Sequence, residues 1–221
     1  MKKITLTLLG LFAMSTSALA QQEVKFGPKA GVNFATLSGK DAGDAKMAIG
    51  FHVGAFVEVK LNDKFAIQPE ILYSAQGAKG KSDAEQMGIS VSSQADLKTS
   101  YLNVPIMAKY YVTPNFAFEA GPYVGFLMNA KTEFTSEIMG ISTEGTYDVK
   151  EAMNTVDFGV GVGANFNLEN GFFVGARYNL GLSKIYKDYQ ADTSNPNLVI
   201  AGDSQANIKN SVIQVSVGYK F

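Results

Sequence analysis

The sequence contains no cysteine, no tryptophan and a single histidine. Without cysteine, the chain has no disulfide framework, no thiol nucleophile, no cysteine-based zinc site and no lipoprotein anchor. Charged residues make up 18% and the net charge is −1, so the basic excess that a nucleic-acid-binding face requires is missing. We therefore expect no nucleic-acid partner. The chain is nevertheless 46% hydrophobic and holds 22 glycines, a composition that excludes a disordered protein.

The first 20 residues have the three parts of a secretory signal peptide. Two lysines follow Met1, an apolar run covers residues 4–14, and Ala18-Leu19-Ala20 supplies the small-x-small cleavage pattern. The run is far shorter than the roughly 20 residues that a membrane-spanning helix needs. We predict a signal peptide over residues 1–20 and a mature domain over residues 21–221.

Hydrophobic residues of the mature chain recur at every second position, which is the period of a β-strand and not of a helix. Over residues 51–61, one face carries Phe51, Val53, Ala55, Val57, Val59 and Leu61. Three strand pairs of this kind are each joined by a short turn. The turns are Asn62-Asp63-Lys64, Thr113-Pro114-Asn115 and Glu169-Asn170-Gly171. With a first strand near 26–36 and a last one near 208–221, the sequence predicts eight strands.

Short and long connections alternate along the chain, as in outer-membrane barrels with short periplasmic turns and long outer loops. The long polar segments lie near 37–46, 80–98, 132–153 and 187–207. A secreted sandwich is the alternative, but its second strand face should be rich in solvated side chains. Here that face carries glycines such as Gly121, Gly159, Gly161, Gly163 and Gly175, which suit a narrow interior. We predict an all-β, eight-stranded antiparallel up-and-down transmembrane β-barrel in the cell outer membrane, with lipid against its apolar face.

Aromatic residues collect near the strand ends, in the manner of the two interfacial girdles of a membrane barrel. The predicted girdle near the short turns comprises Phe65, Phe116, Phe118, Phe166, Phe172, Tyr219 and Phe221, and the outer one comprises Tyr73, Phe126 and Tyr178.

Four segments of the mature chain resemble the PorT-like outer-membrane β-barrel family of Bacteroidetes. They are Gly27-Pro28-Lys29-Ala30-Gly31-Val32-Asn33-Phe34, Gln68-Pro69-Glu70-Ile71-Leu72-Tyr73-Ser74, Tyr101-Leu102-Asn103-Val104-Pro105 and Glu119-Ala120-Gly121-Pro122-Tyr123. The resemblance extends over essentially the whole mature chain and implies an eight-stranded outer-membrane barrel. Because the namesake is linked to protein secretion and gliding, it also implies secretion or envelope proteins as partners. The last five residues resemble the aromatic-ended signal that the barrel assembly machinery reads during insertion.

Charged residues predicted to point into the barrel are the only group of side chains that suggests a functional site. Counting from the second turn places Lys109 opposite Glu119, and counting from the third places Arg177 opposite Gly163, so we predict a Lys109–Glu119 ion pair. The predicted interior ion network comprises Lys29, Glu58, Glu70, Lys109, Glu119 and Arg177. Since an interior of eight strands is just wide enough for side chains, we interpret the network as a structural plug. A gated ion path is the alternative.

Other motifs support no catalytic, cofactor or metal site. Gly159-Val160-Gly161-Val162-Gly163 resembles a phosphate loop, but it lies within a strand and no helix follows it. His52 points inward, away from lipid, and is expected to be a hydrogen-bonded interior residue. The acids of the long segments match no calcium-loop spacing.

Several prolines lie inside predicted strands, although proline cannot donate to a β-ladder. We predict β-bulges at Pro69, Pro105 and Pro122.

The predicted function is that of a non-enzymatic outer-membrane protein that presents extracellular loops to partners, with a PorT-like secretion or envelope component as its finer form. A small-solute or ion pore is the first alternative. A lipid-modifying enzyme is the second, and the sequence suggests no histidine–serine–acid set on an accessible face.

Overall fold

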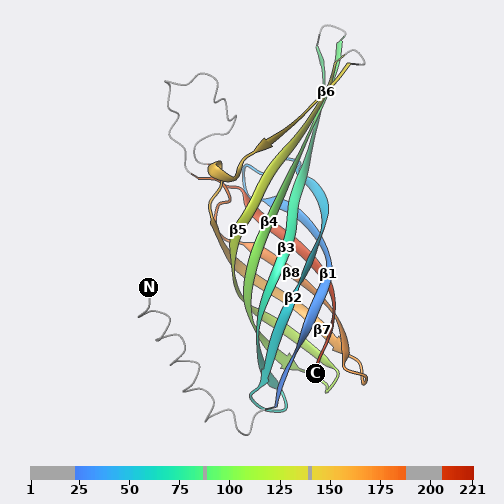
Figure 1. Cartoon of the computed structure of the whole chain (residues 1–221), viewed down its shortest axis with the longest axis vertical. Helices are drawn as coiled ribbons and strands as arrows, with labels where there is room; N and C mark the ends of the chain where they lie inside the picture. Colours follow the sequence, from blue (N-terminus) through green and yellow to red (C-terminus); the bar gives the residue numbers. More distant parts are fainter. Residues whose placement is uncertain (1–22, 87–88, 139–140, 188–205) are drawn as a thin grey trace.

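The computed structural model describes residues 23–86, 89–138, 141–187 and 206–221 of the chain. The predicted signal peptide, 1–20, lies outside the described residues. In order, the elements are β1 (Val24–Ser38), β2 (Lys46–Lys60), β3 (Phe65–Gln86), β4 (Ile89–Tyr111), β5 (Phe116–Ile138), β6 (Ile141–Asp148), the 3₁₀ turn η1 (Lys150–Ala152), β7 (Val156–Asn167), β8 (Phe172–Gly181) and β9 (Lys209–Tyr219) (Figure 1).

Eight of these strands close into an antiparallel barrel. Each barrel strand pairs with the next barrel strand along the chain, so that β5 pairs with β7 past the hairpin strand β6, and β9 returns to β1. The predicted fold class and strand number are therefore confirmed. Closure gives every barrel strand two neighbours, which satisfies the backbone groups that lipid cannot hydrogen-bond.

The three predicted turns lie at one end of the barrel, between β2 and β3, β4 and β5, and β7 and β8. The Asn62 side chain accepts hydrogen bonds from the backbone N–H groups of Lys64 and Phe65, at 2.9 Å each. Gly171 ends the third turn with φ +88°, a conformation that a side chain would strain. In outer-membrane barrels this short-turn end faces the periplasm.

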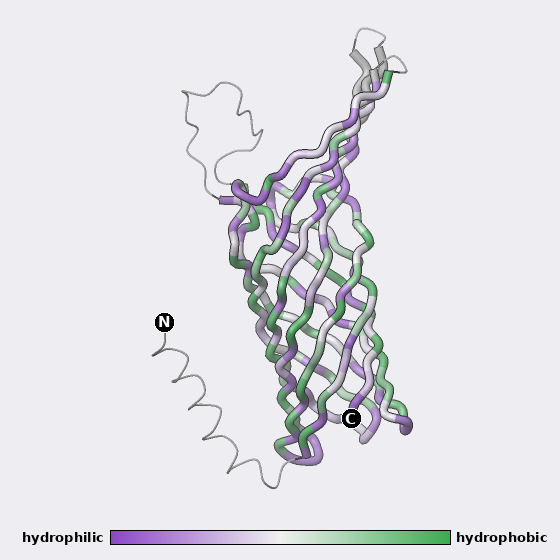
Figure 2. Tube along the Cα trace, viewed as in Figure 1, coloured by the Kyte–Doolittle hydropathy of each residue, from purple (hydrophilic) through white to green (hydrophobic). Residues whose placement is uncertain are grey.

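The outer surface of the barrel is apolar. Exposed large hydrophobic residues recur at alternate positions, for example Val156, Phe158, Val160 and Val162 on β7, and Figure 2 shows hydrophobic residues repeated along the barrel strands. Aromatic rings contact one another near the short turns, as Phe65 and Tyr110 do at 5.2 Å between centroids. This surface is what a lipid-facing band with an aromatic girdle requires. No helix in the described part of the chain is long and apolar enough to cross a membrane.

Two of the predicted loops are instead strands. Residues 80–86 and 89–98 continue the β3–β4 ladder out to Gln86 and Ile89. Residues 132–138 form the upper part of β5, and residues 141–148 form β6. β3, β4 and β5 are 22, 23 and 23 residues long, about twice the 9–11 residues that cross a membrane. The excess forms a four-stranded sheet, here named the β-extension, which rises beyond the barrel (Figure 1). Strands already paired in the barrel provide a template for these Thr- and Ser-rich segments, whose polarity alone suggested loops.

The predicted bulges at Pro69, Pro105 and Pro122 are wrong. The register does not shift at any of these prolines; instead, two residue pairs drop out of the ladder beside each and the same register then resumes. An antiparallel ladder loses only the bond of the missing N–H, so a local gap suffices. The register shifts occur elsewhere, between Met47 and His52 on β2 and between Ser100 and Tyr101 on β4.

Candidate functional site

A network of buried charges fills the middle of the barrel. Glu70 on β3 accepts two hydrogen bonds from the Arg177 guanidinium, at 2.6 and 3.0 Å. It also forms an ion pair with Lys29 Nζ at 3.1 Å. Arg177 Nε also donates to Glu119, whose second oxygen accepts from the Asn165 amide. The fork geometry of arginine lets one cation neutralise two carboxylates from different strands.

A second cluster lies closer to the short turns. Glu58 on β2 accepts from Lys109 Nζ at 2.9 Å, from Lys220 Nζ at 2.8 Å and from the Tyr111 hydroxyl at 2.6 Å. Gln68 links the two clusters, because it accepts from Lys109 and donates to Glu70. The interior charges therefore form one continuous hydrogen-bonded network.

The structure brings all six predicted network residues together, but it changes one pairing. Lys109 lies opposite Glu119 and Arg177 opposite Gly163, so both predicted registers are confirmed. The expected Lys109–Glu119 ion pair is wrong, since Lys109 pairs with Glu58 and Glu119 with Arg177. In a narrow barrel a long side chain reaches across the interior as easily as to its neighbouring strand.

Sequence reasoning missed Lys220 and the uncharged linkers Gln68, Tyr111 and Asn165. The sequence does indicate that Lys220 points inward. Tyr219 and Phe221 were predicted to lie on the outer face, so the residue between them points into the barrel. With Lys220 included, the network has four cations and three carboxylates within the described residues.

Aromatic side chains occupy the interior at the short-turn end. Phe56 and Phe173 are 2% and 0% exposed and meet edge to face, with centroids 5.3 Å apart. Lys220 Nζ lies 5.5 Å from the Phe173 ring centroid, in the range of a cation–π contact.

An apolar lid covers the opposite mouth. The chain that follows η1 meets the segment after β8 through the backbone, where Met153 pairs with Tyr186. The buried members of the lid are Leu97, Tyr101, Leu127, Ala130, Met153 and Ile185. Burial raises the pKa of the Tyr186 phenol at its margin. Both ends of the interior are thus lined by tightly packed side chains.

His52 lies inside the barrel between two polar side chains. Its Nδ1 is 2.8 Å from Asn33 Oδ1 and its Nε2 is 2.9 Å from Ser216 Oγ. Hydrolase triads have the same arrangement, in which one histidine nitrogen contacts a serine hydroxyl and the other contacts a side-chain oxygen. The sequence did not suggest this set, because Ser216 lies on a distant strand. Asn33, His52 and Ser216 are 0%, 1% and 5% exposed, so lipid at the outer surface does not reach them.

Replacing His52 by alanine should therefore leave the phospholipid and lipid A profiles of the outer membrane unchanged. We expect its hydrogen bonds to Asn33 and Ser216 to stabilise the fold. The variant should therefore unfold at a lower urea concentration, and its free energy of unfolding should fall by about 1–3 kcal/mol, because two buried polar partners are left unsatisfied. Mass spectrometry of extracted lipids from wild-type, His52→Ala and Ser216→Ala strains measures the first effect. An altered lipid profile shared by both variants would contradict the structural role.

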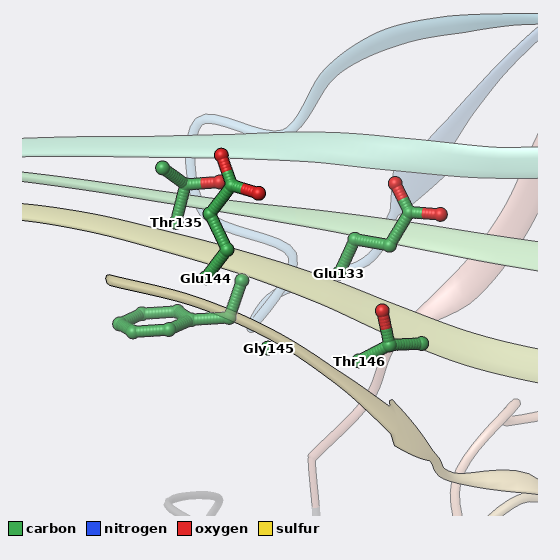
Figure 3. A pocket seen from close by; sticks show the side chains of 6 residues that line it. Glu133, Thr135, Glu144, Gly145 and Thr146 are labelled. Carbon is green, nitrogen blue, oxygen red and sulfur yellow. The ribbon is translucent and has the colours of Figure 1, made fainter. Parts of the chain in front are cut away.

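The β-extension carries the second candidate site. Glu133 and Thr135 on β5 and Glu144 and Thr146 on β6 point to the same side of the sheet and border a shallow depression (Figure 3). Phe134 lies between Glu133 and Thr135 on β5 and is paired with Gly145, so it points to the other side of the sheet. Figure 2 shows mainly hydrophilic residues on this part of the chain. The face of β5 that meets lipid in the barrel is thus continued by a charged face in the β-extension, beyond the lid.

These features define a small outer-membrane β-barrel protein. The eight-stranded barrel is closed, its outer band is apolar, its polar interior is packed, and a sheet extends from one end. The family model of the outer membrane protein β-barrel domain matches residues 19–187. The chain belongs to this family, and its location is the outer membrane.

Solved outer-membrane proteins are similar to the chain at low sequence identity. Ail, the attachment invasion locus protein of Yersinia pestis, is 15% identical with a TM-score of 0.46, over 90% of this chain and 99% of that one. OprG from Pseudomonas aeruginosa is 14% identical with a TM-score of 0.38, over 90% and 97%. Neisserial surface protein A is 13% identical with a TM-score of 0.38, over 89% and 97%. A search of curated protein sequences finds no match to the chain.

Proposed function

We propose that this protein is a non-enzymatic outer-membrane barrel that presents its β-extension to partner proteins at the cell surface. The observation that carries the proposal is the contrast between the two halves of β3, β4 and β5. The barrel halves enclose a filled interior, whereas the outer halves form a sheet beyond it whose edge strand β6 is mostly exposed. Paired strands of this length are a rigid platform, and rigid surfaces bind at lower entropic cost than mobile loops.

Site-specific photo-crosslinking in native cells tests this proposal. A crosslinking amino acid at Thr135, on the broad face of the β-extension, should give discrete protein adducts. The same amino acid at Asp63, in a short turn at the periplasmic end, should not give these adducts. Absence of adducts from Thr135 in every growth condition would contradict presentation of the β-extension to a protein partner.

The finer proposal is a PorT-like role within a secretion or envelope assembly. Its support is the resemblance of the four segments around Pro28, Pro69, Pro105 and Pro122, three of which contribute residues to the interior network. Such an assembly would contact the periplasmic turns, so adducts from Asp63 with envelope proteins would favour it. Insertion by the barrel assembly machinery through the terminal Tyr219-Lys220-Phe221 is part of the same proposal.

A pore is the less favoured function, since the interior is occupied by the ion network between the lid and the Phe56–Phe173 pair. The purified protein in a planar bilayer should show no stable single-channel conductance. Glu119→Gln should also be silent, because the amide keeps the volume that blocks the path. Steady conductance that rises in Glu119→Gln would instead establish an ion path through the network.

A further inference from the structure

The outer edge of the β-extension is an unpaired strand. β6 pairs with β5 over Lys131–Ile138, and no other described strand lies on its far side. Val149 N–H donates to Ala130 O at 3.1 Å, which makes this pair a hydrogen-bonded one. Hydrogen-bonded and non-hydrogen-bonded pairs alternate in an antiparallel ladder. The backbone N–H and C=O groups of Ser142, Glu144, Thr146 and Asp148 therefore point away from β5, toward the free edge.

A free edge of this kind is a template for another strand. Natural sheets usually protect such an edge with lysine, proline or a bulge, and β6 has none of the three. With two backbone groups on each of four residues, it offers up to eight hydrogen bonds to an incoming strand. Addition of an extended peptide to a sheet edge is a common mode of protein recognition.

The charges near this edge select the incoming strand. On the face that carries Glu144, strands β5 and β6 bring four carboxylates against one lysine; they are Glu133, Glu137, Glu144, Asp148 and Lys131. Lys98 of β4 neutralises Glu133 at 2.6 Å, and the Glu144 side chain is exposed. A side chain opposite Glu144 across the edge lies on this acidic face, so a lysine or arginine there is favoured.

The opposite face of β6 selects apolar side chains at the intervening positions. Ile141 and Tyr147 are 73% and 63% exposed there. The Tyr147 side chain leans over Gly145, with atoms of its phenol group 3.2–3.5 Å from where a Cβ would lie. Because neighbouring residues of a strand point to opposite faces, the fitting partner alternates basic and apolar residues.

We propose that β6 is a docking edge for an extended segment of a partner protein with alternating basic and apolar residues. This inference rests on the proposed function, since it names how the β-extension would bind. A second copy of the chain fits less well. Two copies in one membrane related by an axis along its normal run their β6 strands in the same direction, and pairing would place carboxylates against carboxylates.

A synthetic peptide tests the edge directly. The probe is a capped nine-residue peptide of alternating lysine and valine, titrated into the full-length protein in nanodiscs. Thr146→Pro removes an outward N–H without breaking a bond to β5, and Thr146→Val is its matched control. We expect Thr146→Pro to weaken binding about tenfold or more, a loss of about 1.4 kcal/mol, while Thr146→Val stays within about twofold. Glu144→Gln should weaken binding several-fold at low salt and less at high salt.

Two control peptides separate strand addition from simple charge attraction. A version methylated on alternate backbone nitrogens keeps its charge but cannot pair, and should not bind. A version with glutamate in place of lysine should not bind either. Hydrogen exchange at the Glu144 and Thr146 amides should slow when the parent peptide is bound. Equal thermal unfolding of both Thr146 variants verifies that the barrel itself is intact.

Equal binding of the parent and methylated peptides, or of Thr146→Pro and Thr146→Val, would overturn the proposal. Equal binding of the acidic peptide would overturn the charge selection. Dimers in analytical ultracentrifugation that Thr146→Pro abolishes would replace the proposed occupant by a second copy. If Thr135 adducts in cells persist unchanged in Thr146→Pro, the edge inference fails while the proposed function stands.

Discussion

Replacing Arg177 by methionine should destabilise the barrel by about 3–5 kcal/mol, the usual cost of removing one partner from a buried ion pair. Arg177 is 3% exposed and neutralises both Glu70 and Glu119, at 2.6 and 2.5 Å. Without the guanidinium, Lys29 remains as the cation beside Glu70, and Glu119 retains the hydrogen bond from the Asn165 amide. Urea unfolding of the refolded protein in lipid vesicles, extrapolated to water, measures the loss.

Two control variants identify the cause of that loss. Lys98→Met removes an exposed ion pair with Glu133 and should cost about 0–1 kcal/mol. Adding Glu119→Gln to Arg177→Met should recover part of the stability, because the second change removes the orphaned charge. If Arg177→Met unfolds at the same urea concentration as the wild type, the ion network does not stabilise the barrel.

Replacing Gly121 by valine should prevent the barrel from closing. A Cβ at Gly121 would lie 2.0 Å from the backbone oxygen of Ile106 on β4, and a backbone oxygen cannot move aside as a flexible side chain can. Overpacking of a core commonly costs about 1–3 kcal/mol, and a clash with the ladder itself should cost more. The measurement is the fraction of folded barrel after refolding, together with the urea midpoint of Gly121→Ala.

Gly80 is the matched control, since a Cβ there would lie 3.5 Å from Ala95 O, an ordinary contact. Gly80→Ala should fold as well as the wild type. If Gly121→Val also folds normally, glycine at this position does not reflect a lack of space between β4 and β5.

The barrel halves of the strands were predictable because their pattern is local. A side chain on an antiparallel strand points in or out according to its distance from the nearest turn. Counting from Thr113-Pro114-Asn115 is therefore enough to place Lys109 opposite Glu119. The glycines on the inner face, such as Gly121 and Gly163, likewise indicate a narrow interior through their alternation with apolar residues, and a Cβ at either position would meet a backbone oxygen.

The length of the strands was not predictable in the same way. The residues after Ala78 and after Thr132 are mostly polar, a composition typical of loops when each segment is taken alone. They form strands because β3, β4 and β5 leave the barrel already paired, so each added residue extends an existing ladder. The same cooperativity lets the ladder pass Pro69, Pro105 and Pro122 with a gap in place of a bulge.

By itself, the sequence determined the period, the turns, the number of barrel strands and which face of each strand is apolar, because these depend on neighbours along the chain. The tertiary structure alone decided which interior charges pair, since Glu58 and Lys109, or Arg177 and Glu70, meet only when the closed ring brings distant strands within side-chain reach. It also decided that β6 has a free edge among the described strands, because an edge is defined by the strand that is missing beside it.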